Sequence, residues 1–342
     1  MKQSCRFFPL AFAVLLVMLA TPARASFPGK NGRIAFDFGD IYTMNPDGSD
    51  VRQLTNLGPD NFAFYASWSS DGKQLVFNQS NSDNFHAEVW LMDADGKNGR
   101  RILSEAKFND FVPYFSPDNQ SVVFARCPIN LPDTCGIYQV NVNGGAPTSI
   151  TKFKLGNTDL FPEYSPDGRT VIFESSGREG IVEAIYRLGP HDKTPRRLTH
   201  PALDIGVPDW SPEGLKIAIG THRQDPQNQE IGVVGVGGGG FSILTHSGVN
   251  CCDGPHDGYP SWSPQGDAIV FERDSPDFSI ASIYVLTLGS STPSKLITLS
   301  RAVRPNVARA RGLHALSKQT RQNLPKQILQ GGFSPHWGVA AN

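Results

Sequence analysis

Aspartate side chains recur beside a repeated Pro-x-aromatic-Ser step and could support binding chemistry. The carboxylates just before or within the step are Asp60, Asp110, Asp159, Glu163, Asp204, Asp209 and Asp257. Carboxylates gathered around one opening attract a cation, a basic peptide or a sugar bridged by a metal. The alternative interpretation is that each aspartate caps a turn through its own backbone, as loop aspartates commonly do.

Four histidines could supply a transition-metal site, because neutral imidazole is a good ligand for such ions. They are His86, His222, His256 and His336. None has a metal-ligand spacing such as H-x-H or H-x-x-E-H, so scattered loop histidines are the alternative. The sequence also lacks the G-x-S-x-G nucleophile motif. A metal-dependent hydrolase or polysaccharide lyase is therefore the enzyme alternative, and no cofactor is expected unless a divalent cation binds.

The step itself recurs along the whole chain and predicts a repeat architecture. Its copies begin at Ala66, Pro113, Pro162, Pro208, Pro260 and Pro335. The first five are separated by 46 to 52 residues. A period of this length is typical of one supersecondary unit that must stack on its neighbours to bury its apolar faces.

Each unit contains four predicted strands. An apolar triplet such as Val171-Ile172-Phe173 follows the step, and an Ile-Tyr-like pair and a Leu-Thr-like pair follow the triplet. Turns such as Ser165-Pro166-Asp167-Gly168 place Pro and Gly where a tight turn needs them. Repeated four-stranded antiparallel units predict an all-β fold, a β-propeller.

The two ends of the chain complement each other. The first predicted strand, 32–36, is the second strand of a unit, whereas 334–338 is a first strand with no second strand after it. We therefore predict that both ends share one blade, which gives a six-bladed propeller without an open edge.

These motifs resemble the TolB-type propeller repeat, most closely in segments 162–173, 208–219 and 260–271. The resemblance covers 30–298 and 333–338 and implies a six-bladed propeller. TolB is a periplasmic part of a cell-envelope complex and binds protein partners and peptide segments at its propeller mouth. An α/β domain precedes the propeller of TolB, whereas here we expect only a few residues between Ser26 and the first predicted strand. Similar repeats occur in prolyl oligopeptidase-like peptidases and polysaccharide lyases. Fold alone therefore does not decide function.

In this architecture the first strand of each blade is innermost, and loops from all blades meet at one mouth of the channel. The residues expected to contact a ligand there are Asp110, Phe111, Asp159, Phe161, Asp204, His256, Asp257, Tyr259 and His336. The prediction is a non-catalytic, monomeric propeller that binds a protein, peptide or glycan segment at this mouth.

Residues 1–25 are predicted to be a signal peptide. Lys2 and Arg6 precede an apolar core, and Ala23-Arg24-Ala25 is a small-residue cleavage step before Ser26. A retained anchor is the alternative, and no other stretch is apolar enough to span a membrane. We therefore expect a periplasmic or secreted protein, with residues 26–342 forming the propeller.

Export permits disulfides, and four cysteines follow the signal peptide. Cys127 and Cys135 bracket a loop between two predicted strands and are expected to pair. Cys251 and Cys252 are adjacent, and either a strained disulfide or a metal or redox role is open.

The charge distribution is uneven. The formal net charge is −1, but residues 299–330 carry seven basic and no acidic side chains. An acidic body with one basic insertion is not typical of a nucleic-acid-binding protein. The basic part, 301–326, either docks on an acidic partner or an anionic surface or is a solvated excursion of the last blade.

Overall fold

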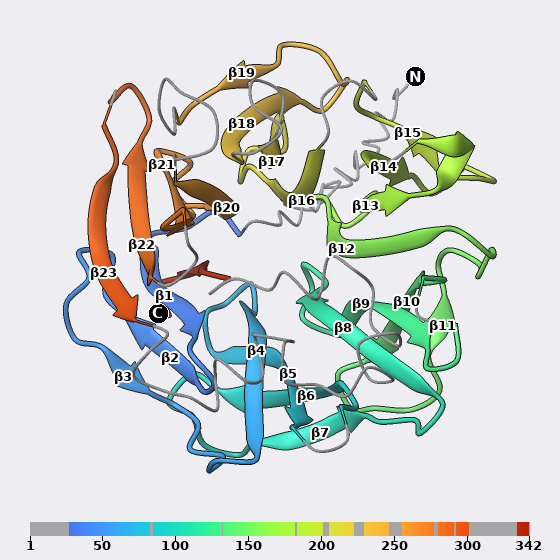
Figure 1. The fold of residues 1–342 in the computed structure, drawn as a ribbon, viewed down its shortest axis with the longest axis horizontal. Helices are drawn as coiled ribbons and strands as arrows, with labels where there is room; N and C mark the ends of the chain where they lie inside the picture. Colours follow the sequence, from blue (N-terminus) through green and yellow to red (C-terminus); the bar gives the residue numbers. More distant parts are fainter. Residues whose placement is uncertain are drawn as a thin grey trace, which may run out of the picture.

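The protein is a six-bladed β-propeller in which every blade is a four-stranded antiparallel sheet (Figure 1). The computed structural model describes residues 27–82, 85–131, 133–181, 183–200, 205–221, 229–245, 255–276, 280–290, 292–300 and 334–341. The described residues form 24 strands and one short 3-10 helix. The all-β, six-bladed fold predicted from the repeat is confirmed.

Blade 1 joins the two ends of the chain. Its strands, from the inside outward, are β24 (His336–Val339), β1 (Asn31–Asp37), β2 (Ile41–Met44) and β3 (Arg52–Gln53). Ile34 pairs with Trp337 and Ala35 with His336 in an antiparallel ladder. The Trp337 indole N–H also donates to the Gly32 carbonyl at 3.2 Å. The predicted closure of the ring by both chain ends is therefore confirmed.

Blades 2 and 3 are built from consecutive strands that run from the inside outward. Blade 2 contains β4 (Asn61–Trp68), β5 (Gln74–Asn81), β6 (Glu88–Asp93) and β7 (Arg100–Leu103). Blade 3 contains β8 (Phe108–Phe115), β9 (Ser121–Pro128), β10 (Gly136–Asn141) and β11 (Thr148–Ser149).

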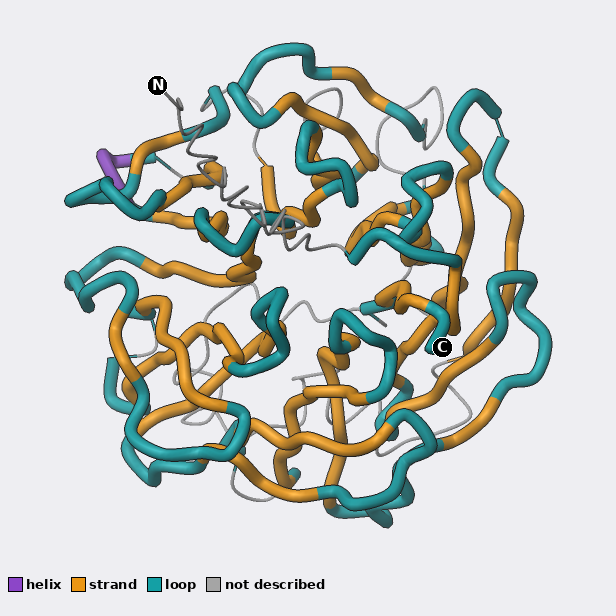
Figure 2. Tube along the Cα trace, turned by 180° about the vertical axis from the view of Figure 1, so that it is seen from behind, coloured by secondary structure: helices purple, strands orange, loops and turns teal. Residues whose placement is uncertain are grey.

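Blades 4, 5 and 6 repeat this order around the ring (Figures 1 and 2). Blade 4 contains β12 (Thr158–Tyr164), β13 (Val171–Ser176), the 3-10 helix η1 (Arg178–Gly180), β14 (Ala184–Leu188) and β15 (Arg196–Arg197). Blade 5 contains β16 (Ile205–Trp210), β17 (Lys216–Thr221), β18 (Glu230–Gly235) and β19 (Ser242–Ile243). Blade 6 contains β20 (His256–Trp262), β21 (Ala268–Asp274), β22 (Ile280–Thr287) and β23 (Ser294–Ser300).

The turn after each inner strand has the chemistry that the Ser-Pro-Asp-Gly sequence predicts. In blade 4 the Gly168 N–H donates to the Ser165 carbonyl at 2.8 Å, and the Ser165 hydroxyl donates to Asp167 at 2.6 Å. Gly168 has φ of +69°, a left-handed conformation that glycine adopts at little cost. In blade 3 Asn119 takes the same place with φ of +59°.

A bulge interrupts five of the inner strands at the same point. The residue before the Pro-x-aromatic step has positive φ in each case: Tyr65, Val112, Phe161, Val207 and Tyr259, with φ between 49° and 53°. The ladder register to the second strand shifts across each of these residues. A bulge turns the strand and re-aims one side chain, so these five side chains point inward to the channel axis.

The core lies between neighbouring blades. The last residue of the apolar triplet is at most 2% exposed in all six blades: Phe36, Phe77, Phe124, Phe173, Ile219 and Phe271. Each blade thus buries its second strand against the next blade, as a closed repeat array requires.

Several predictions fall on residues outside the described ranges. These are the signal peptide 1–25, the basic segment 301–326, Asp204, His222, Cys251 and Cys252.

Candidate functional site

The channel has two ends with different chemistry. We call the end at the loops between blades, where the inner strands begin, the mouth. We call the end at the Ser-Pro-Asp-Gly turns the turn end. The positive-φ residues lie between the two ends, in the middle of the inner strands.

Three aromatic rings meet at the channel axis between the two ends. Tyr65, Phe161 and Tyr259 come from alternate blades, 2, 4 and 6, and their ring centroids are 5.9 to 6.2 Å apart. Val112 and Val207 of blades 3 and 5 pack into the same cluster. Burial raises the pKa of Tyr65 well above its usual value, and Tyr259 adds to the shift. We call these three rings, which are in mutual contact between the mouth and the turn end, the aromatic plug.

In blade 3 the predicted mouth residue Asp110 is buried and paired. Its carboxylate accepts two hydrogen bonds from Arg126 on the neighbouring strand, at 2.7 and 3.0 Å. The Arg126 guanidinium also binds Glu105 at 2.8 Å and lies 4.6 Å from the Phe108 ring centroid. Burial raises the pKa of Asp110 to about 6, although Arg126 opposes the shift.

Blades 4 and 6 also pair the equivalent aspartate with an arginine, which comes from η1 in blade 4 and from β21 in blade 6. Asp159 accepts from the Arg178 Nε at 2.9 Å and from the Thr151 hydroxyl of blade 3 at 2.7 Å. Asp257 accepts from Arg273 at 2.5 and 2.6 Å, and burial raises its pKa while Arg273 opposes the shift. Asp110, Asp159 and Asp257 are all 0% exposed. A ligand at the mouth therefore meets buried Asp–Arg pairs there rather than free carboxylates, and ligand contact by these residues stays a prediction.

The other predicted site residues lie in separate places. Phe111 is 0% exposed beneath the Phe85 ring at 6.0 Å. His256 starts β20 at the mouth, whereas His336 lies beyond the aromatic plug at the turn end. His86 contacts the Glu105 and Phe108 carbonyls through Nε2 at 3.1 and 2.9 Å. Among the described residues, no group of three or more His, Cys, Asp or Glu side chains is arranged to hold a metal.

A group of aromatic side chains at the mouth was not predicted. Phe62, Phe64 and Phe85 are each partly exposed, with ring centroids 5.5 to 6.3 Å apart. Phe64 also contacts Tyr65 of the plug at 5.3 Å. We call these three residues the aromatic belt, which leads from the rim of blade 2 down to the plug.

The sequence carried a signal for the belt. Ala63 of blade 2 occupies the place that Asp110 has in blade 3, because both lie two residues before the positive-φ residue. Blade 2 therefore has no Asp–Arg pair there, and phenylalanines flank Ala63 on both sides. An aromatic pair beside a missing repeat aspartate marked the position.

The turn end is surrounded by the variable residue of each Pro-x-aromatic-Ser step. These six residues are Ser67, Tyr114, Glu163, Asp209, Ser261 and His336, and we call them the turn-end ring. Four of them accept a hydrogen bond from the aromatic residue's backbone N–H in the next blade. Glu163 accepts from Trp210 at 2.8 Å, Asp209 from Trp262 at 2.8 Å, Ser261 from Trp337 at 3.2 Å and His336 from Trp68 at 3.4 Å.

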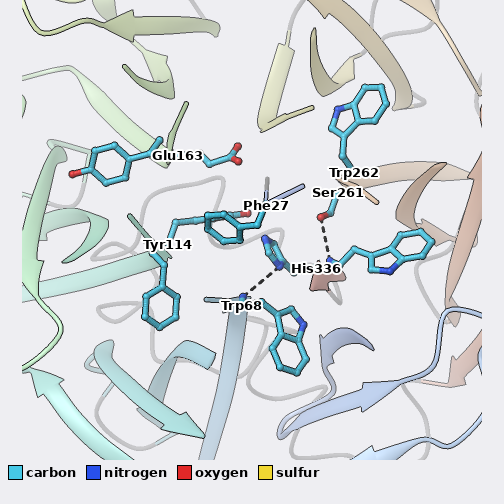
Figure 3. Close-up of a pocket in the computed structure, with 10 residues that line it drawn as sticks. Phe27, Trp68, Tyr114, Glu163, Ser261, Trp262 and His336 are labelled. Carbon is cyan, nitrogen blue, oxygen red and sulfur yellow. Dashed lines mark hydrogen bonds between the residues drawn. The ribbon is translucent and has the colours of Figure 1, made fainter. Parts of the chain in front are cut away.

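A small cavity of about 10 Å³ lies within this ring. Phe27 lines it together with Tyr114, Glu163 and His336 (Figure 3). Burial lowers the pKa of His336 to about 4 and raises the pKa of Asp209 to about 8. His336 is therefore neutral at pH 7.

A larger pocket of about 550 Å³ lies at the seam between blades 1 and 2. The strand ends near Asn31 and Val339 line it, together with Arg33, Arg52 and Trp68. The Arg33 guanidinium is already occupied by Thr43, Asn45 and Asp50. Both arginines at the seam pocket are thus engaged inside the protein, since Arg33 and Arg52 each pair with Asp50.

The predicted disulfide between Cys127 and Cys135 is confirmed, with an S–S distance of 2.01 Å. It closes the loop between β9 and β10 at the mouth. Beside it, the Cys135 N–H donates to the Asn157 carbonyl at 3.1 Å, and the Thr158 hydroxyl donates to the Asp133 carbonyl at 2.8 Å. The disulfide loop therefore ties blade 3 to blade 4.

Within the described ranges, no helix is long and apolar enough to span a bilayer.

Comparison with known proteins gives relatives that match part of this chain. An uncharacterized protein of Agrobacterium fabrum, Atu1656, is 30% identical over 192 residues, which are 55% of this chain and 62% of that protein. Dipeptidyl-peptidase 5 of Porphyromonas gingivalis is 25% identical over 172 residues, or 47% of this chain and 23% of the peptidase. The chain thus spans less than two thirds of either relative.

Among solved structures, TolB from Acinetobacter baumannii has a similar fold. The TM-score is 0.66 at 20% sequence identity, and the match covers 92% of this chain and 69% of that TolB. Residues 86–305 match the TolB beta propeller domain. This match spans more than half of the sequence, so the chain belongs to the TolB beta-propeller domain family.

Proposed function

We propose that this protein is an exported, non-catalytic propeller that binds a peptide or glycan segment at its mouth. The observation that carries the proposal is the aromatic belt, whose partly exposed Phe62, Phe64 and Phe85 lead down to the aromatic plug. Exposed aromatic side chains gathered in a concave site are typical binding anchors.

We expect the aromatic plug to limit how far a ligand enters the channel from the mouth. A segment that enters the mouth meets Tyr65, Phe161 and Tyr259, which are in mutual contact across the axis. Its side chain or sugar ring would then pack on the belt, because aromatic faces accept both apolar side chains and the C–H faces of sugars. The buried Asp–Arg pairs give the wall a fixed shape and little net charge.

The A-x-A step before Ser26 and the Cys127–Cys135 disulfide support export. A disulfide of this kind persists in an oxidising compartment and is rare in the cytosol. The metal-dependent hydrolase or lyase alternative stays a prediction that metal analysis of the purified protein tests.

Binding is tested with two probes, a displayed random-peptide library and a panel of bacterial polysaccharide fragments. We expect one of them to yield a ligand whose affinity falls roughly 30-fold in Phe64→Ala, because a central anchor contributes about 2 kcal/mol. Leu215→Ala is the matched control, since Leu215 is 64% exposed at the turn end. Ligands that bind Phe62→Ala and Phe64→Ala as tightly as the unchanged protein would contradict the proposal.

A further inference from the structure

The turn-end ring contains two buried acids and no lysine or arginine. Glu163 and Asp209 come from neighbouring blades and are 5% and 1% exposed. The other ring members are Ser67, Tyr114, Ser261 and His336, none of them a lysine or arginine. Burial of a carboxylate is costly unless a cation or enough donors compensate it.

Asp209 is only partly compensated. Its Oδ2 accepts from the Trp262 N–H at 2.8 Å, and the Ser261 hydroxyl acts to lower its pKa. Its buried Oδ1 has no hydrogen-bond partner among the residues that the structure describes. Burial nevertheless dominates and raises the pKa of Asp209 to about 8. In the described structure the carboxyl is therefore largely protonated at neutral pH, and a cationic donor at its Oδ1 would favour the ionised form.

The chain itself enters the same space. The ring of Phe27 lies among Tyr114, Glu163 and His336 (Figure 3). Two residues later the Gly29 N–H donates to the Pro264 carbonyl in the blade 6 turn, at 3.2 Å. The Phe27 side chain packs on the hydrophobic cluster that contains Phe115 of blade 3. Blade 3 lies opposite blade 6 in the propeller. Residues 27–29 therefore cross the turn end of the channel.

Removal of the signal peptide would create a cation next to Phe27 in the sequence. Hydrolysis of the Ala25–Ser26 amide consumes one water and yields the Ala25 carboxylate and the Ser26 amine. That amine has a pKa near 8 and takes up a proton at neutral pH. A chain that begins at Ser26 thus carries a positive charge one residue before Phe27.

We infer that the turn-end ring is the binding site for the protein's own processed N-terminus. The Ser26 ammonium donates to Asp209, with Glu163 as a second acceptor, and signal-peptide removal thereby completes a buried ion pair. This inference rests on the proposed export, because only an exported chain loses residues 1–25.

The test uses protein prepared in vitro, so that it does not depend on export itself. A fusion is cut by a protease that leaves Ser26 as the first residue, and a second form keeps Gly-Ser before Ser26. We expect the form with free Ser26 to melt several degrees higher, because the extension displaces the ammonium from the ring. We also expect its α-amine to be methylated roughly tenfold more slowly by formaldehyde and borohydride, which corresponds to one unit of raised pKa.

Variants of two turn-end ring residues test whether this ring causes the differences in melting temperature and amine reactivity. Asp209→Asn and Glu163→Gln should each reduce the difference in melting temperature and speed α-amine methylation, read by mass spectrometry of the N-terminal peptide. Glu213→Gln is the matched control, because Glu213 is exposed in the blade 5 turn at the same end. Equal melting and equal amine reactivity of the two forms would overturn the inference, as would a difference that both ring variants leave unchanged. Failure of binding at the mouth would leave all these readouts intact.

Discussion

Blades 2 and 3 carry different residues at the same position of the inner strand, and their mouth surfaces differ as a result. Blade 3 places Asp110 there and pairs it with Arg126, so that the mouth wall is held by a buried ion pair. Blade 2 places Ala63 opposite Gln79 and leaves Phe62 and Phe64 partly exposed. Blades 3, 4 and 6 thus hold the mouth wall with a buried Asp–Arg pair, whereas blade 2 lacks the pair and leaves aromatic side chains partly exposed there.

Breaking the pair in blade 3 should have the largest effect. Asp110→Ala leaves the Arg126 guanidinium, whose side chain is 4% exposed, without its main partner. We expect a loss of about 3–5 kcal/mol in the free energy of unfolding, measured by urea titration. A loss below about 1 kcal/mol, similar to that of the exposed control Glu213→Ala, would show that the pair is not needed.

Introducing an Asp–Arg pair at the equivalent positions of blade 2 tests whether blades 2 and 3 are built alike. Ala63→Asp alone buries an unpaired carboxylate, and we expect it to cost about 2–4 kcal/mol. Adding Gln79→Arg should recover most of this loss, because Gln79 pairs with Ala63 in the strand register. In blade 3 the Arg126 guanidinium lies over the rings of Phe124 and Tyr138. Phe77 and Trp90 occupy the equivalent positions in blade 2. If the double variant is no more stable than Ala63→Asp, positions 63 and 79 of blade 2 are not equivalent to positions 110 and 126 of blade 3.

The Cys127–Cys135 disulfide lies beside the contacts between blades 3 and 4, and its removal should weaken these contacts. Replacing both Cys127 and Cys135 by serine should cost about 2–3 kcal/mol, as expected for a short closed loop. Amide exchange should also speed up at Cys135 and Asp159, whose N–H groups bond across the two blades. Unchanged exchange at both positions would show that the loop is held without the disulfide.

The sequence predicted the frame of this molecule better than its site. Six blades and the Cys127–Cys135 bridge followed from spacing, because the repeat period and hairpin pairing are local properties. The shared blade 1 followed from the complementary partial units near the two ends of the sequence. Side-chain direction did not follow, because the bulge at residues such as Val112 breaks the alternation of inward and outward positions. The partner of Asp159 is Arg178 in η1, which no strand register could have indicated.

At the turn end, His336 should give a smaller, pH-dependent effect. Its pKa is about 4 in the folded protein against 6.5 for an ordinary histidine, because its partly buried imidazole loses the solvation that the charged form needs. As the pH falls below 6.5, the unfolded chain takes up a proton that the folded protein refuses until about pH 4. Stability should therefore fall by up to about 1.4 kcal/mol per pH unit in this window.

Replacing His336 with glutamine removes this contribution, because glutamine can still accept a hydrogen bond but does not titrate. Urea titrations at pH 7, 6 and 5 should show a shallower loss of stability than in the unchanged protein. His191→Gln is the control, since His191 is exposed. Equal pH dependence in His336→Gln and the unchanged protein would mean that another group dominates.

The most direct measurement is a crystal structure of the protein with a bound peptide or glycan obtained from the two probes. We predict that the ligand lies at the mouth, in contact with Phe62, Phe64 and Phe85 and stopped by the aromatic plug. A ligand found instead in the seam pocket beside Arg33 and Val339, with the aromatic belt unoccupied, would contradict the account.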